Sequence, residues 1–172
     1  KMLGETKSIK GQIEFLIKLQ VLDKELYTLN SEKEDIPLKI KAIDEALGSK
    51  KQGMKQAEAD LKGLQMKLKD REVALQQKED QVKKLELQLY QLKSNKEYSA
   101  MLAEIGGFKA DNSLVEEEIL RLMDDIDAAK RRLLGEKECL AREGADADKK
   151  KDEIRKKEKE IEIKKSNFDT PI

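Results

Sequence analysis

The sequence predicts an all-α fold, a long antiparallel coiled-coil hairpin whose first arm is kinked near Pro37. Charged residues make up 42% of the chain and aromatic residues 3%, so an ordinary globular core lacks the bulky side chains it needs. Apolar residues recur with a heptad period in the first half, and a second heptad phase follows in the second half. These observations together are typical of long paired helices.

The first arm is expected at residues 1–92, where one heptad phase continues without a slip. Alternate steps of four and three residues from Phe15 to Leu92 define 23 positions, of which four are charged. Such a run exceeds what an amphipathic helix of a globular protein would produce. These positions, the first seam, are Phe15, Leu19, Leu22, Leu26, Leu29, Lys33, Ile36, Ile40, Ile43, Leu47, Lys50, Met54, Ala57, Leu61, Leu64, Leu68, Arg71, Leu75, Lys78, Val82, Leu85, Leu89 and Leu92.

Pro37 is expected to interrupt this arm without changing its register. Asp35 can cap a new helix with Pro37 in its first turn, where the missing N–H has little cost. We therefore predict a helix to about residue 33, a kink or short break at about 34–37, and a long helix to about residue 92.

The hairpin turn is predicted at residues 93–97, because the heptad phase changes there. Ser94 followed by Glu97 has the spacing of a capping box, which begins a helix. A turn at residues 106–113 is the alternative, since Gly106 and Gly107 could end a helix before Ser113 caps another. The phase change favours the earlier turn.

The second arm is expected at residues 98–168, with residues 169–172 as a tail. Its apolar stripe starts strongly and weakens toward the C-terminus. These positions, the second seam, are Met101, Ile105, Phe108, Asn112, Val115, Ile119, Leu122, Ile126, Ala129, Leu133, Glu136, Leu140, Glu143, Ala147, Lys150, Ile154, Lys157, Ile161, Lys164 and Phe168. Each seam can bury the other, which predicts a monomeric hairpin; a homodimer is the alternative.

Composition argues against an enzyme and against several kinds of site. The chain has no histidine, the commonest general base and metal ligand. Residues 48–55 resemble a phosphate-binding loop but carry Met54 where the lysine is required. The net charge is zero, a single cysteine (Cys139) excludes an internal disulfide framework, and no apolar run could span a bilayer. We expect a cytoplasmic protein with no catalytic residues and no metal ligands or cofactor within this chain.

Two stretches could contact a partner. The first is the predicted tip, where a partner can reach side chains unobstructed; its candidate residues are Asn95, Lys96, Glu97, Tyr98, Met101, Glu104 and Ile105. The second is residues 149–165, with nine basic and five acidic residues. Its candidate phosphate contacts are Lys149, Lys150, Lys151, Arg155, Lys156 and Lys157. The alternative for this stretch is a solvated helix end stabilised by i,i+4 ion pairs.

Several short segments also resemble a known family. They are Leu-Asp-Lys-Glu-Leu at 22–26, Asp-Ile-Pro at 35–37, Asn-Lys-Glu-Tyr-Ser-Ala at 95–100 with Glu-Ile at 104–105, and Glu-Ile-Leu at 118–120. The sequence resembles, over about residues 10–168, bacterial coiled-coil hairpin proteins that end in a four-cysteine zinc ribbon.

The resemblance implies a cytoplasmic, non-enzymatic protein connected with transcription or with flagellar and type III secretion regulation. It also implies zinc in a C-terminal ribbon beyond the tail. This chain departs from the family pattern, because it contains no Cys-x-x-Cys motif.

Three functional hypotheses follow. The first is an adaptor or chaperone-like protein that binds a protein partner and positions it. The second is a nucleic-acid-binding module with the hairpin as a spacer, and the third is a purely structural coiled-coil spacer.

Overall fold

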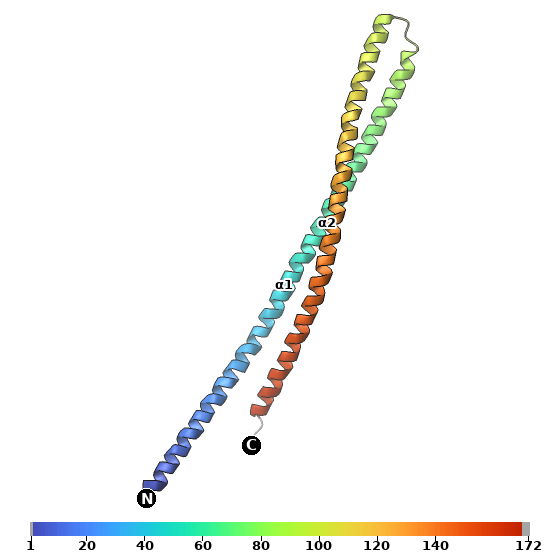
Figure 1. The fold of residues 1–172 in the computed structure, drawn as a ribbon. Coiled ribbons are helices and arrows are strands. Elements are labelled where there is room, and N and C mark those ends of the chain that lie inside the picture. The colour runs from blue at the N-terminus through green and yellow to red at the C-terminus, as the bar shows by residue number, and fades with distance from the viewer. Residues whose placement is uncertain (1, 170–172) are drawn as a thin grey trace. The chain divides into compact units, whose positions relative to one another are not determined.

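The fold is a pair of long helices packed against each other, as the computed structural model shows for the backbone of residues 2–169 and the side chains of residues 8–168 (Figure 1). Helix α1 (Met2–Leu89) and helix α2 (Asn95–Asp169) are joined by a turn at residues 90–94. The structure describes no strand in this range. The predicted all-α hairpin is therefore confirmed. Asp169 of the predicted tail is the last residue of α2, and residues 170–172 lie outside the described range.

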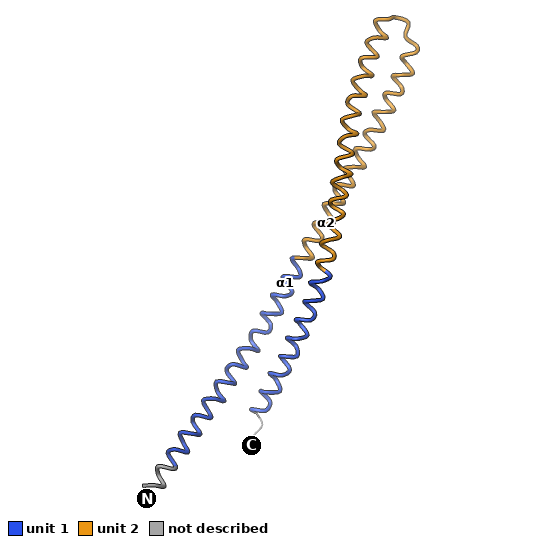
Figure 2. Tube along the Cα trace, in the orientation of Figure 1, with its two compact units in different colours: residues 1–49, 141–172 blue, residues 50–140 orange. Residues whose placement is uncertain are grey.

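The chain divides into two compact units, each built from one stretch of both helices (Figure 2). Unit 1 comprises Lys1–Ser49 and Ala141–Ile172, and unit 2 comprises Lys50–Leu140 with the turn. Within each unit α1 and α2 run in opposite directions.

The core of unit 2 follows the two seams. Val82, Leu89 and Ile105 form a buried cluster, and the other buried side chains of this unit are also seam positions. They are Ala57, Asn112, Val115, Ile119, Leu122 and Ile126. Both heptad phases were thus assigned to the correct faces. Ala57 is the most deeply buried apolar side chain, with 2% of its surface exposed.

Ion pairs between the helices of unit 2 show the antiparallel register directly. Glu86 Oε1 accepts from Lys109 Nζ at 2.7 Å. Arg71 Nε lies 3.3 Å from Glu118 Oε2, and Arg132 Nη1 lies 3.6 Å from Asp60 Oδ2. The α1 residue number falls as the α2 number rises. Exposed pairs of this kind contribute about 0–1 kcal/mol each to stability. They therefore restrict the alignment of the two helices more than they stabilise the fold.

Unit 1, which contains the N-terminal stretch of α1 and the C-terminal stretch of α2, has a smaller core of its own. Leu29, Ile36 and Ile161 are buried together, and Ile40 and Ile154 pack against them. Lys151 Nζ donates to Asp44 across the two helices. Here too the buried side chains lie on the predicted seams.

The predicted break at residues 34–37 is absent, because α1 is helical through Pro37. Proline removes the hydrogen bond to the carbonyl of residue 33 and crowds that carbonyl, which usually breaks a helix. Here Ile36 and Ile40, on either side of Pro37, both pack in the unit 1 cluster. We attribute the continuity of α1 to these contacts, since they hold the helix against its partner on both sides of the proline.

The turn lies at residues 90–94 and not at 93–97, so its predicted position was three residues too late. The alternative turn at 106–113 is wrong: Gly106 and Gly107 lie inside α2 and neither has a positive φ. Ser113 Oγ donates to the carbonyl of Lys109 at 3.1 Å, so its hydroxyl bonds back within the helix and caps nothing.

Asn112 is a buried polar side chain in the second seam. It is 6% exposed, and its Oδ1 accepts no hydrogen bond from the described residues. A buried polar side chain in a coiled-coil seam lowers stability while restricting the alignments that the helices can adopt.

Replacing Pro37 by alanine should stabilise unit 1, because alanine restores the missing N–H donor in a helix that is already continuous. We expect a gain of about 1–3 kcal/mol in the free energy of unfolding, measured by urea denaturation with far-UV circular dichroism. Leu38→Ala, at the neighbouring exposed position, is the matched control and should change stability by less than about 0.5 kcal/mol. An unchanged or lower stability of Pro37→Ala would show that the helix is interrupted at Pro37 in solution.

Candidate functional site

The turn end of unit 2 is held by a small set of backbone hydrogen bonds. The N–H groups of Gln91 and Leu92 donate to the carbonyls of Gln88 and Leu89 at 3.0 and 3.3 Å, which tightens the last turn of α1. Tyr98 N–H donates to the Ser94 carbonyl at 2.9 Å, so Ser94 is the N-cap of α2. The turn is therefore a short and well-defined connection.

Two residues predicted to contact a partner at the tip are in the seam instead. Ile105 is 4% exposed within the Val82–Leu89 cluster, and Met101 is half-buried against the same cluster. Their apolar side chains continue the heptad stripe of α2, and that stripe faces α1. The side chain of Ile105 is therefore buried between the helices, and part of the Met101 side chain is covered by the same cluster.

The other predicted tip residues are exposed. Asn95, Lys96 and Glu97 occupy the first turn of α2. Tyr98 follows them with 42% of its surface exposed, and Glu104 is exposed nearly two turns further on. The structure brings these side chains to one end of unit 2.

Sequence reasoning missed three further exposed side chains at this end. Tyr90 is 85% exposed, the largest exposed fraction among the large apolar and aromatic side chains that the structure describes. Leu87 and Leu102 are also exposed. The sequence does contain an indication of this exposure. All three residues are apolar or aromatic, yet they lie between seam positions and not in a seam.

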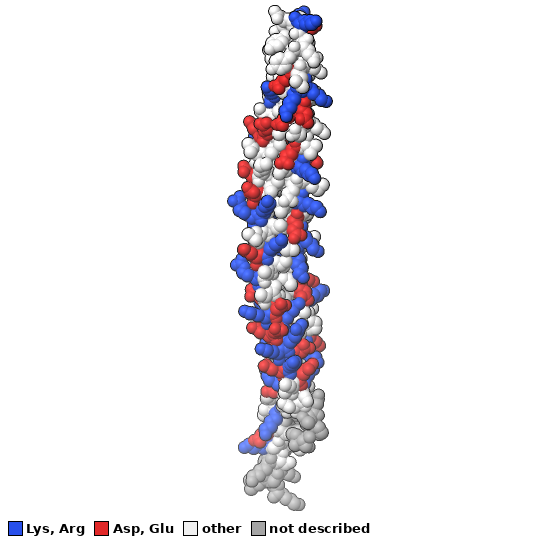
Figure 3. Space-filling view, turned by 90° about the vertical axis from the view of Figure 1, so that its right-hand side faces the viewer, with Lys and Arg blue, Asp and Glu red and all other residues white. Residues whose placement is uncertain are grey.

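The tip is poor in charge as well as rich in exposed apolar surface. Residues 87–103 contain three charged side chains in 17 positions, whereas the whole chain is 42% charged. In Figure 3 the turn end is largely uncharged, while basic and acidic side chains alternate over the rest of the visible face. Protein-binding surfaces are depleted in charge and enriched in tyrosine, so the tip has the composition of such a surface.

The predicted phosphate contacts in unit 1 do not form a comparable surface. Lys151 is engaged with Asp44, and Arg155 Nη1 lies 3.6 Å from Asp152 Oδ1. Lys149, Lys150, Lys156 and Lys157 are exposed, with acidic residues placed among them. Two of the six candidates are therefore paired with carboxylates, which favours the solvated helix end over a phosphate-binding surface.

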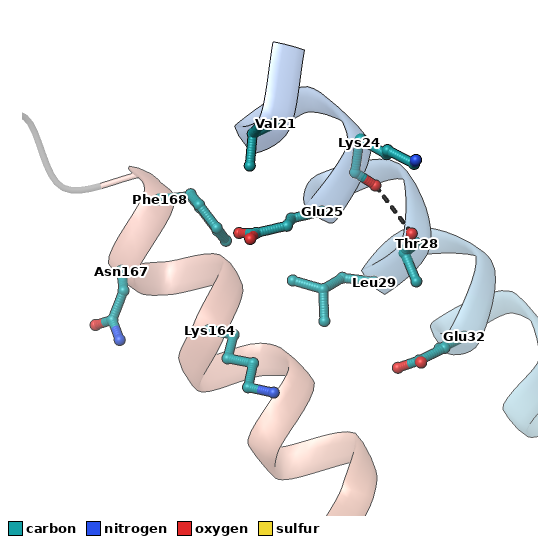
Figure 4. A pocket seen from close by; sticks show the side chains of 9 residues that line it. All are labelled: Val21, Lys24, Glu25, Thr28, Leu29, Glu32, Lys164, Asn167 and Phe168. Atoms are coloured by element: carbon teal, nitrogen blue, oxygen red, sulfur yellow. Dashed lines mark hydrogen bonds between the residues drawn. The ribbon is translucent and has the colours of Figure 1, made fainter. Parts of the chain in front are cut away.

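A groove of about 910 Å³ lies in unit 1 where the last turns of α2 meet α1 (Figure 4). Phe168 projects toward Val21 and Glu25. Leu29 contributes apolar surface to the same groove. Thr28 Oγ1 donates to the Lys24 carbonyl at 2.9 Å, as in many exposed helices. Nothing in this lining has the arrangement of a nucleophile with a general base.

The described residues also offer no metal centre. No three His, Cys, Asp or Glu side chains among them are grouped to hold a metal ion. With one cysteine in the chain, its residues do not fit a four-cysteine zinc site. No helical stretch in the described range has the length and apolar character needed to span a bilayer.

Comparison with known proteins identifies a structural relative. The structure is similar to that of CT398 from Chlamydia trachomatis, with a TM-score of 0.77 and 22% sequence identity. The likeness establishes the fold alone. It covers 87% of this chain, which spans 63% of the length of CT398. No protein-family model matches the sequence. No curated protein matches it either.

The assignment of Ile105 to the seam predicts a large effect on stability. Ile105→Ala should lower the free energy of unfolding by about 2–4 kcal/mol, because it leaves a cavity between the helices. Leu102→Ala, at an exposed position one turn away, should cost less than about 1 kcal/mol. Urea denaturation of both variants measures the difference. Equal and small effects would mean that Ile105 is not packed in the seam in solution.

Proposed function

We propose that this protein is a non-enzymatic coiled-coil adaptor that binds a protein partner through the tip of unit 2. The observation that carries the proposal is the exposure of Tyr90 and Tyr98 at a charge-poor turn. Tyrosine offers a large rigid contact area with a polar end, and it is enriched at the centres of protein interfaces.

The packing beneath the tip supports this role. The Val82, Leu89 and Ile105 cluster lies directly under the turn, with Leu92 and Phe108 packed against it. A turn held by such a cluster presents its exposed side chains in one arrangement, which lowers the entropy lost on binding. Adaptor function requires an exposed and well-ordered binding surface, and it requires no catalytic residue.

A partner-capture experiment tests the proposal. The hairpin is immobilised and incubated with an extract of its own cell, and the retained proteins are quantified by mass spectrometry. We expect the double change Tyr90→Ala and Tyr98→Ala to reduce capture of the specific partner at least tenfold, because the loss of two anchors costs more than about 1.4 kcal/mol. Far-UV circular dichroism should show unchanged helicity.

Tyr27→Ala is the matched control, since Tyr27 is the third tyrosine of the chain and is 75% exposed in unit 1. It should leave capture unchanged. Equal capture by all variants would refute binding at the tip. Capture that disappears after nuclease treatment would instead support a nucleic-acid-binding module, and the absence of any specific capture would support a structural spacer.

We further propose membership of the zinc-ribbon hairpin family that the sequence resembles, with a role in transcription or in flagellar and type III secretion regulation. The likeness in fold is compatible with this assignment. Family membership predicts a native protein heavier than the 19.7 kDa of this chain, with about one zinc ion per molecule. Intact mass and metal content of protein purified from its own cell measure both. A zinc-free protein of 19.7 kDa would remove the link to transcription and secretion.

A further inference from the structure

The stretch of α2 that belongs to unit 1 has an incomplete seam. Its second-seam positions fall into two sets, and within each set the residues are spaced by seven. One set is apolar and consists of Ala147, Ile154, Ile161 and Phe168. The other, which we name the charged set, consists of Glu143, Lys150, Lys157 and Lys164. A two-helix seam is built from apolar side chains at both sets, so this stretch supplies half of a seam.

The same helix has a nearly complete seam in unit 2. The ten second-seam positions from Met101 to Leu133 are apolar except for Asn112. Six of these ten side chains are buried, whereas in unit 1 two of the eight second-seam side chains are buried, those of Ala147 and Ile161. The change in seam composition along α2 is therefore accompanied by a loss of packing.

Helix α1 does not share this deficiency. Of its eight first-seam positions from Leu22 to Leu47, seven are apolar and Lys33 is the exception. Within unit 1, α1 therefore presents a seam that is apolar at both sets of positions, and α2 covers it with a helix that is apolar at one set.

The packing of unit 1 shows which α1 residues face the charged set. Leu29, Ile36 and Ile161 are buried together, and Ile154 packs against them. Both seams advance by alternate steps of four and three residues, so an alignment of Leu29 with Ile161 also aligns Ile36 with Ile154. This alignment places the charged set, in the order Glu143, Lys150, Lys157 and Lys164, opposite Leu47, Ile40, Lys33 and Leu26.

The burial of the individual side chains agrees with this alignment. The three lysines of the charged set are exposed although they occupy seam positions, and Leu26 and Ile40, which face two of them, are half-buried. Leu29 and Ile36, which face the apolar set, are 8% and 6% exposed. Good packing in unit 1 is thus confined to alternate levels of the seam.

One level of this seam contains two like charges. Lys33 and Lys157 face each other between the levels of Leu29 and Ile36, and both side chains are exposed. Lysine stems can lie along an apolar surface while the ammonium groups stay in water. Two ammonium groups at one level repel each other, so this level opposes the pairing that its neighbours favour.

From these observations we infer that residues 141–168 of α2 form a releasable strap on α1. The strap detaches as a unit from residues 22–49, while the two helices of unit 2 stay paired. Most of the stability of a protein helix comes from the packing of its apolar face, so both stretches lose amide protection when they separate. Detachment uncovers the α1 seam from Leu22 to Leu47, and the strap thereby controls access to it. This inference is independent of the tip and of the adaptor function.

Native-state hydrogen exchange of the full chain, followed by mass spectrometry, tests the inference. We expect peptides from residues 26–47 and 143–164 to share one level of amide protection, because the two stretches open together. That level should be roughly tenfold or more below the protection of peptides from residues 57–89 and 101–133.

Completion of the seam should close the strap. The double change Lys150→Leu and Lys157→Leu places apolar side chains opposite Ile40 and Lys33 and removes the repulsion between the two lysines. We expect it to raise the protection of residues 26–47 of α1, where no residue has been changed, by roughly tenfold or more.

Lys149→Leu with Lys156→Leu is the matched control. It makes the same two replacements one residue away, at exposed positions outside the seam, and should leave the protection of α1 unchanged. Equal protection of the two units would overturn the inference. So would protection that declines gradually toward the chain ends, which indicates fraying, or an equal response of α1 to the two pairs of substitutions.

Discussion

The fold depends on one interaction, the burial of two narrow heptad seams against each other. A compact globular protein of 19.7 kDa would expose about 8,600 Å², whereas this chain exposes 13894 Å². No large side chain is fully buried within the described range. Two helices have only one shared face, so nearly all apolar stabilisation comes from side chains such as Ile36, Val82 and Ile105. Every buried residue of the described chain is a seam position.

The seams also carry polar residues, which a purely stabilising design would exclude. Lys33, Lys78 and Asn112 occupy seam positions, and Asn112 is buried without a hydrogen bond to its Oδ1 from the described residues. Leucine at these sites would strengthen several alignments at once, because a uniform apolar stripe fits its partner at every heptad shift. Polar seam residues are compatible with fewer alignments. The short turn and the ion pairs of Arg71, Lys109 and Arg132 favour the same alignment, so register is set at several places.

Much of the fold could be predicted from the sequence, because helix pairing depends on a period that is visible in the residues. The heptad spacing alone placed Leu29, Ala57 and Ile126 on the faces that the two helices bury. Continuity at Pro37 could not be predicted, since it depends on Ile36 and Ile40 gaining contacts with α2 that local sequence does not contain. The turn was predicted too late because the first seam extends to Leu92, whereas α1 ends at Leu89 and Leu92 packs against the cluster from within the turn. The candidate site was less predictable than the fold. Tyr90 lies off the seam, which indicates exposure, but its place at the tip becomes evident only when the turn is located.

A two-helix protein of this kind has few places where specific recognition can develop. On the face that Figure 3 shows, basic and acidic side chains alternate along the paired stretches, so one part of this surface resembles the next. Specific binding requires a surface that differs from this background. The charge-poor tip of unit 2 is such a surface. There, apolar and aromatic side chains fall outside the seam that α2 covers, and Tyr90 is exposed where the chain turns. Each helix can bury only one face against the other. Apolar side chains outside that face stay exposed, and a partner can bind where they gather.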